Sequence, residues 1–208
     1  MNNIKKIDFI FLVISTFLLG LIYGSFFKNI IDLFKKDYIK RKKYLNGKYI
    51  FFCYPHTSYL DGLLSISTSF LYVQSHNFSP LFPIAQHHSV PNFIKKYTYP
   101  IGTKNNQTKD LIKLINNLEN CNLYIAPEGT RKRTEKIKKG FYFIAKDTNL
   151  PIVCVTTNFS KFETFYSNPI SVKNKSIDEV MEEIKKWYKN HDMNEVSIDI
   201  NKISPLKI

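Results

Sequence analysis

The sequence lacks the residue patterns that mark several common classes of protein. Its three cysteines, Cys53, Cys121 and Cys154, are far apart in apolar surroundings and show none of the close spacings of a zinc site. Three thiols cannot all pair, so we expect buried, reduced cysteines in a reducing compartment. The absence of a G-x-S-x-G sequence argues against a hydrolase with a serine nucleophile. No internal repeat, low-complexity tract or interior linker is present, which predicts one soluble domain.

Acidic residues are also scarce. The 208 residues contain 17 Asp and Glu against 30 Lys and Arg, which gives a formal net charge of +13. Such a charge attracts anions, whether nucleic acid, an anionic membrane face or a phosphorylated substrate. Codon bias toward lysine is the alternative explanation for part of it. No nucleic-acid-binding motif accompanies the lysines, so we expect no nucleic-acid partner.

A long uncharged run lies near the N-terminus. Residues 9–27, "FIFLVISTFLLGLIYGSFF", are about long enough to cross ~30 Å of hydrocarbon as a helix. Basic residues are denser after this run than before it, which favours the cytoplasm for the C-terminal side of the run. We therefore expect an uncleaved membrane anchor, with a cleaved signal peptide as the alternative. Residues 28–45 fit either a basic amphipathic helix on anionic lipid or a solvated linker helix.

After residue 46 the chain alternates between strand-like and helix-like segments. This alternation predicts a single α/β layered domain over residues 46–208, with a mostly parallel or mixed central sheet flanked by helices, preceded by the membrane segment of residues 1–45. Ser176 and Glu179 form a capping box, and Thr108 is expected to cap a helix that runs to Leu118. Strands are expected at 48–54, 79–86, 99–103, 122–126 and 151–159, and helices at 61–74, 89–98, 108–118, 140–148 and after Ser176.

The first polar motif, "PHTSYLD" at residues 55–61, directly follows the apolar run "KYIFFCY". The carboxyl edge of an open α/β sheet is where such folds place their sites. His56 and Asp61 are the kind of pair that a general base needs, because the carboxylate fixes the tautomer of the histidine and stabilises the imidazolium. A solvated loop histidine beside an aspartate at a helix N-terminus is the alternative interpretation.

The second motif, "APEGTRKR" at residues 126–133, follows the apolar run "NLYIA". Gly129 permits a tight turn and close approach of a ligand. Arg131 is able to bind a phosphate through two parallel hydrogen bonds. A turn with solvated basic residues is the alternative.

Together, "PHTSYLD" and "PEGTR", 72 residues apart, resemble the paired signature of the glycerophospholipid acyltransferases of the 1-acylglycerol-3-phosphate acyltransferase type. The segments "KGFYFIA" at 139–145 and "LPIVCV" at 150–155 match the family's later blocks. The resemblance covers residues 46 to 170 and is greatest to the small bacterial-type members. It implies a membrane-bound O-acyltransferase of phospholipid biosynthesis.

The resemblance also implies roles for individual residues. His56 would be the general base and Asp61 would orient it. Glu128, Gly129, Thr130 and Arg131 would line the acceptor site, with Arg131 near the acceptor phosphate. Thr57 and Ser58 would donate hydrogen bonds, or would cap the following helix instead.

One motif departs from the family. Where relatives carry a phosphate-binding arginine, this chain has "KKYTYPIGTKNN", and Lys104 is the best positional match. A lysine binds phosphate as a point charge without the planar fork of arginine, so the acceptor is less defined than the reaction. Lys95, Lys96 and Lys109 are alternatives to it.

The resemblance further implies the partners. The donor would be acyl-CoA or acyl-carrier protein and the acceptor a lysophospholipid at the membrane, with the catalytic domain on the cytoplasmic side. No metal or other cofactor is expected. The alternatives are the same chemistry on another acceptor (a different lysophospholipid, glycerol phosphate or a non-glycerolipid) and a non-catalytic, membrane-anchored basic binding protein.

Overall fold

The computed structural model describes residues 44, 47–58, 80–84, 95, 98–100, 107–161 and 163–208, with the backbone alone for 80–84. Within these residues six strands form one sheet in the order β3-β2-β4-β1-β5-β6. The first five run parallel to one another and β6 runs antiparallel to β5, so the sheet is mixed, as predicted. The strands are β1 (Lys48–Cys53), β2 (Pro80–Ile84), β3 (Thr98–Pro100), β4 (Cys121–Ile125), β5 (Ile152–Asn158) and β6 (Glu163–Tyr166), and the helices are α5 (Gln107–Asn117), α6 (Gly140–Thr148), α7 (Ile177–Tyr188) and the short 3-10 helix η3 (Ile200–Lys202).

Most of the predicted elements in the described residues are present within one or two residues of their expected limits. The capping box before α7 is confirmed, because the Ser176 hydroxyl accepts the N–H of Glu179 and the Glu179 carboxylate accepts the N–H of Ser176. The predicted cap at Thr108 is wrong, because α5 already begins at Gln107 and Thr108 lies inside the helix. Strand β6 was not predicted. The helix expected at 61–74, the membrane segment at 9–27 and the boundary between residues 45 and 46 lie outside the described residues.

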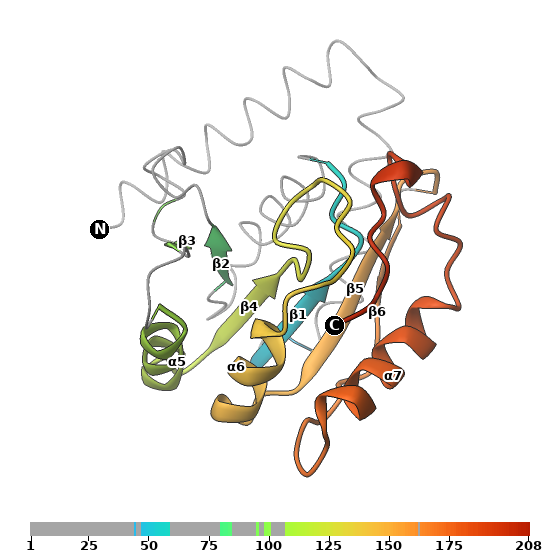
Figure 1. The fold of residues 1–208 in the computed structure, drawn as a ribbon. Coiled ribbons are helices and arrows are strands. Elements are labelled where there is room, and N and C mark those ends of the chain that lie inside the picture. The colour runs from blue at the N-terminus through green and yellow to red at the C-terminus, as the bar shows by residue number, and fades with distance from the viewer. Residues whose placement is uncertain are drawn as a thin grey trace.

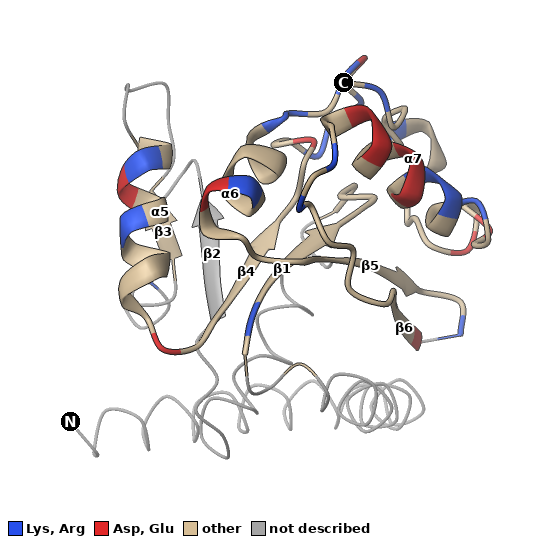
Figure 2. Ribbon diagram, turned by 90° about the horizontal axis from the view of Figure 1, so that it is seen from below, with Lys and Arg blue, Asp and Glu red and all other residues tan. Residues whose placement is uncertain are grey.

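Helices α5, α6 and α7 cover one face of the sheet (Figures 1 and 2). Beneath them Ile50 and Phe52 of β1 are fully buried in the main core, where the Phe52 ring packs edge-on against Phe141 of α6 at 4.9 Å. Burying a phenylalanine side chain contributes about 1.5–3 kcal/mol. Lys, Arg, Asp and Glu colour the outer surfaces of these helices and their loops and are sparse on the strands (Figure 2). The helices are therefore amphipathic and fix β1 firmly from one side.

The opposite face of the central strands is aromatic. Phe51 of β1 is fully buried and stacks on Tyr124 of β4 at 4.8 Å. Tyr44 and Tyr166 approach the same ring, and the Tyr44 hydroxyl donates to the carbonyl of Ser167. Strand β1 is thus buried on both faces, which is why its sequence reads as a continuous apolar run.

Two findings bear on other predictions. None of the three cysteines forms a disulfide; Cys121 and Cys154 are buried and Cys53 is half-buried. In the part of the chain that is described, no helix is both long and apolar enough to span a bilayer.

Candidate functional site

The loop after β1 carries the first motif. Strand β1 ends at Cys53, and a cis peptide bond joins Tyr54 to Pro55 immediately before His56. Because β1 and β4 are parallel neighbours, their carboxyl ends meet at one edge of the sheet, with Phe52 opposite Ile125. The loop of His56 and the loop that follows β4 therefore start side by side.

A direct hydrogen bond joins the two motifs. The backbone N–H of His56 donates to Glu128 Oε2 at 2.6 Å, across 72 residues of sequence. A hydrogen bond from an N–H to a carboxylate is shorter and stronger than one between neutral groups. The contact fixes the backbone of His56 against the second motif.

Glu128 is buried, with 2% of its surface exposed. Burial raises the pKa of its carboxyl group above the ordinary value, whereas the N–H of His56 and the hydroxyl and N–H of Ser204 act in the opposite direction. Its second oxygen, Oε1, is buried without a hydrogen bond of normal geometry. A buried carboxyl group held by specific donors at a sheet edge is characteristic of a functional site.

The second motif turns sharply at Gly129. The N–H of Gly129 donates to the carbonyl of Ala126 at 3.0 Å, and Gly129 has a φ of +66°, in the left-handed region. The Lys138 side chain lies against this turn, so that a Cβ at Gly129 would be 2.6 Å from Lys138 Nζ. The N–H of Lys138 donates to the carbonyl of Pro127 and holds the returning chain in place.

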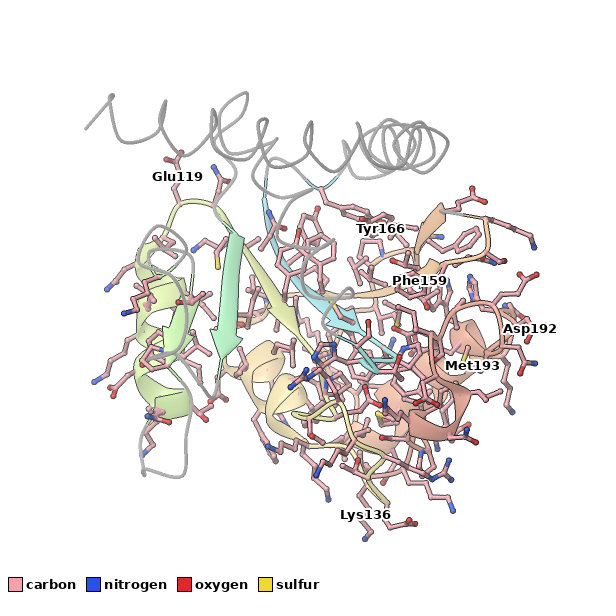
Figure 3. All side chains as sticks on the ribbon, turned by 90° about the horizontal axis from the view of Figure 1, so that it is seen from above. Glu119, Lys136, Phe159, Tyr166, Asp192 and Met193 are labelled. Carbon is pink, nitrogen blue, oxygen red and sulfur yellow. The ribbon has the colours of Figure 1, made fainter. Side chains whose placement is uncertain are left out.

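The remaining residues of the second motif are more accessible. Thr130 and Arg131 are half-buried, and the Thr130 hydroxyl accepts the N–H of Lys132 at 3.2 Å. The exposed Arg133 donates through a guanidinium nitrogen to the carbonyl of Ile203 at 2.8 Å. In Figure 3 Lys136 projects outward from the loop between β4 and α6. Accessible guanidinium and ammonium groups beside a buried carboxyl group suit an anionic ligand.

The two neighbours of His56 differ in exposure. Thr57 is buried, and its hydroxyl oxygen accepts a hydrogen bond from Ser197 at 3.1 Å. Ser58 is half-buried. The predicted partner of His56, Asp61, and the predicted phosphate ligand, Lys104, lie outside the described residues. Of the predicted site residues, the structure joins His56 and Glu128 directly.

The C-terminal segment makes contacts that the sequence does not predict. Ser197 contacts Thr57 of the first motif, and Ser204 contacts Tyr54 and Thr134, which flank the two motifs, although no local pattern marks either serine. Among the residues that the structure describes, no group of three or more His, Cys, Asp and Glu side chains is arranged to hold a metal ion.

The chain was compared with protein families, curated proteins and solved structures. No protein-family model and no curated protein matches the sequence. Among solved structures, the chain is similar to the 1-acyl-sn-glycerophosphate (LPA) acyltransferase PlsC from Thermotoga maritima, with 17% sequence identity and a TM-score of 0.48, over 89% of this chain and 98% of that one.

Proposed function

We propose that this protein is a membrane-bound acyltransferase that moves a fatty acyl group from an acyl thioester to the free hydroxyl of a lysophospholipid. The proposed acceptor is 1-acylglycerol-3-phosphate and the product phosphatidic acid. The observation that carries the proposal is the 2.6 Å hydrogen bond from the His56 N–H to Glu128, because it joins the two motifs of the family signature at one sheet edge.

In the proposed reaction the His56 imidazole removes the proton from the acceptor hydroxyl as its oxygen attacks the thioester carbonyl. The tetrahedral intermediate then expels the thiolate of the donor, which takes the proton back from the imidazolium. One C–O bond forms, one C–S bond breaks, and no acyl-enzyme or metal is required. Asp61 is proposed to orient the imidazole through its other nitrogen.

Glu128 acts in this scheme through the backbone. Its carboxylate is almost completely buried and accepts the His56 N–H, so it holds the base in place. Gly129, Thr130 and Arg131 follow it toward the accessible side of the loop, where Arg131 is proposed to bind the acceptor phosphate, assisted by Lys104. The proposed donor is acyl-CoA or acyl-carrier protein. The catalytic domain is proposed to lie on the cytoplasmic side of a membrane, in which residues 9–27 anchor the protein.

The test is thioester turnover by the detergent-solubilised full chain. Long-chain acyl-CoA and acyl-carrier protein are offered with lysophosphatidate, other lysophospholipids and glycerol 3-phosphate, and thiol release and acyl transfer are followed together. His56→Ala is expected to lower kcat by about 10²–10⁴-fold, the usual contribution of a general base. His191→Ala is the matched control, because this histidine packs against Trp187 and Phe165. The kcat of this variant is expected to equal that of the wild type.

The acceptor dependence separates the parts of the proposal. Transfer to lysophosphatidate that is lost in His56→Ala supports both the reaction and the base. Transfer to another acceptor alone keeps the mechanism and rejects lysophosphatidate. A folded wild-type protein that transfers acyl groups to none of these acceptors from either donor overturns the proposal.

A further inference from the structure

The C-terminal segment, defined here as residues 196–208, lies against the loops of both motifs. Figure 1 shows its red trace running beside the yellow loop between β4 and α6. At the loop after β4, Arg133 donates to the carbonyl of Ile203 and the N–H of Ile137 donates to the carbonyl of Lys207 at 2.7 Å. At the loop after β1, Ser197 donates to the hydroxyl of Thr57. The segment therefore bridges two loops that meet at His56 and Glu128.

Ser204 lies at the centre of these contacts and is fully buried. Its carbonyl accepts the phenol hydroxyl of Tyr54, two residues before His56. Its hydroxyl oxygen accepts the backbone N–H of Thr134 at 3.0 Å, and the Thr134 hydroxyl lies 3.3 Å from it. Ser204 is thus fixed from the β1 side and from the β4 side at the same time.

Ser204 also affects the ionisation of Glu128. Its hydroxyl and N–H both lower the pKa of Glu128, which burial raises. A buried carboxylate needs donors to remain ionised, and Glu128 Oε1 has no hydrogen bond of normal geometry. Loosening of Ser204 is therefore expected to change the ionisation of Glu128.

We propose that Ser204 is a positioning residue of the site: its carbonyl accepts the Tyr54 hydroxyl and its own hydroxyl accepts the Thr134 N–H, so it holds the loop of His56 against the loop of Glu128. This inference rests on the proposed function for its effect on catalysis. It places the C-terminal segment, which belongs to neither motif, among the parts that build the site.

Two variants test the proposal. Ser204→Ala removes the hydroxyl, and Tyr54→Phe removes the donor that fixes the Ser204 carbonyl and leaves Ser204 itself intact. Ser167→Ala is the matched control, because the hydroxyl of Ser167 is also buried and accepts a backbone N–H, that of Cys154 at 2.8 Å. A loss of stability alone would affect the control in the same way.

Two readouts distinguish positioning from stability. The first is the pH dependence of kcat. Two titratable groups that face Glu128 are His56 and Tyr54, and Lys138 Nζ lies over the adjacent Gly129. Loss of the Ser204 hydroxyl raises the pKa of Glu128, so the decline of kcat toward low pH is expected to begin at higher pH in Ser204→Ala. At the optimum kcat is expected to fall by up to about 10²-fold, the effect of a misplaced reacting group.

The second readout does not depend on activity. Hydrogen exchange of the His56 backbone N–H is measured in each variant, and it is expected to be faster in Ser204→Ala and Tyr54→Phe than in Ser167→Ala. If the wild type is inactive, the proposed function fails and this exchange still decides the role of Ser204. If Ser204→Ala does not fold, Tyr54→Phe decides in its place. An unchanged pH profile in an active protein, or His56 exchange equal to that of Ser167→Ala, overturns the inference.

Discussion

The ammonium end of Lys138 lies over Gly129, the residue at which the second motif turns. A Cβ added at Gly129 would be 2.6 Å from Nζ and 2.8 Å from Cε of this lysine, closer than such atoms approach in folded proteins. The contact places a cation over the residue that directly follows Glu128. Gly129 is sensitive to substitution because of its backbone conformation, whereas the flexible end of Lys138 is able to move aside.

Gly129→Ala is expected to lower the free energy of unfolding by about 1–2 kcal/mol, because a φ of +66° is unfavourable for any residue with a Cβ. Displacement of the flexible Lys138 side chain adds little to this cost. The measurement is urea denaturation. Gly140→Ala is the matched control, because Gly140 begins α6 and a Cβ added there has no atom within 4 Å. The free energy of unfolding of this variant is expected to rise by up to about 1 kcal/mol. Equal effects at both positions would contradict the prediction.

Glu128→Gln is expected to change how stability depends on pH. Burial raises the pKa of Glu128 in the folded protein, so between its ordinary value and the folded value the native state binds more protons than the unfolded state. The free energy of unfolding of the wild type therefore falls, relative to that of Glu128→Gln, as the pH rises through this window. Urea denaturation of both proteins across acidic to neutral pH measures the difference.

Glu195→Gln provides a control of opposite sign for that experiment. Hydrogen bonds from Lys161 and Asn158 lower the pKa of Glu195. The stabilising effect of ionised Glu195 is present above its ordinary pKa and is lost as the pH falls through its pKa in the folded protein. The free energy of unfolding of the wild type therefore rises, relative to that of Glu195→Gln, as the pH rises. The same slope for both variants would show that Glu128 is not held as described.

Tyr188→Phe is expected to cost about 1–3 kcal/mol of unfolding free energy, the penalty for leaving buried polar groups unsatisfied. The fully buried phenol of Tyr188 lies 2.8 Å from the carbonyl of Phe52 and 3.0 Å from that of Val155, and so links the ends of β1 and β5 to α7. Tyr142→Phe removes a partly buried hydrogen bond to the carbonyl of Lys175 and is expected to cost about 0.5–1.5 kcal/mol. Chemical denaturation ranks the two, and a larger loss at Tyr142 would oppose the prediction.

Cys121 and Cys154 are expected to resist alkylation while the protein is folded. Burial raises the pKa of each thiol to about 12, so almost no thiolate is present at neutral pH. Cys53 is half-buried and is expected to react first. Iodoacetamide labelling followed by peptide mass spectrometry gives the order, with urea-unfolded protein as the control in which all three react. Native-state labelling of Cys121 or Cys154 at the rate of Cys53 would disprove this.

The parts of the fold that the sequence predicts are those whose signals are local. Strands β1, β4 and β5 each contain a short apolar run, and α7 begins at a capping box that Ser176 and Glu179 form by themselves. Strand β6, "ETFY", has no such pattern and is a strand because it pairs with β5. Thr108 has the chemistry of a cap, but the helix begins before it.

The residues of the candidate site also differ in whether a local sequence pattern predicts them. His56 and Glu128 were both found from motifs, because the residues that carry chemistry stand together in short stretches after apolar runs. Ser204 and Ser197 act through contacts with residues 70 and 140 positions away, Thr134 and Thr57, and no short stretch of sequence records such a contact. Hydrogen bonds between distant segments become visible only when the fold has placed them.

The position of β1 in the sheet has a consequence during protein synthesis. Both neighbours of β1, the strands β4 and β5, come later in the sequence, and β4 begins 68 residues after β1 ends. At about 5–20 residues per second, roughly 3–14 s pass on the ribosome before the first of them exists. For that interval an apolar strand has two open edges, which are templates for wrong pairing. Chaperone demand and aggregation in cells should therefore concentrate on the nascent chain that ends between β1 and β4.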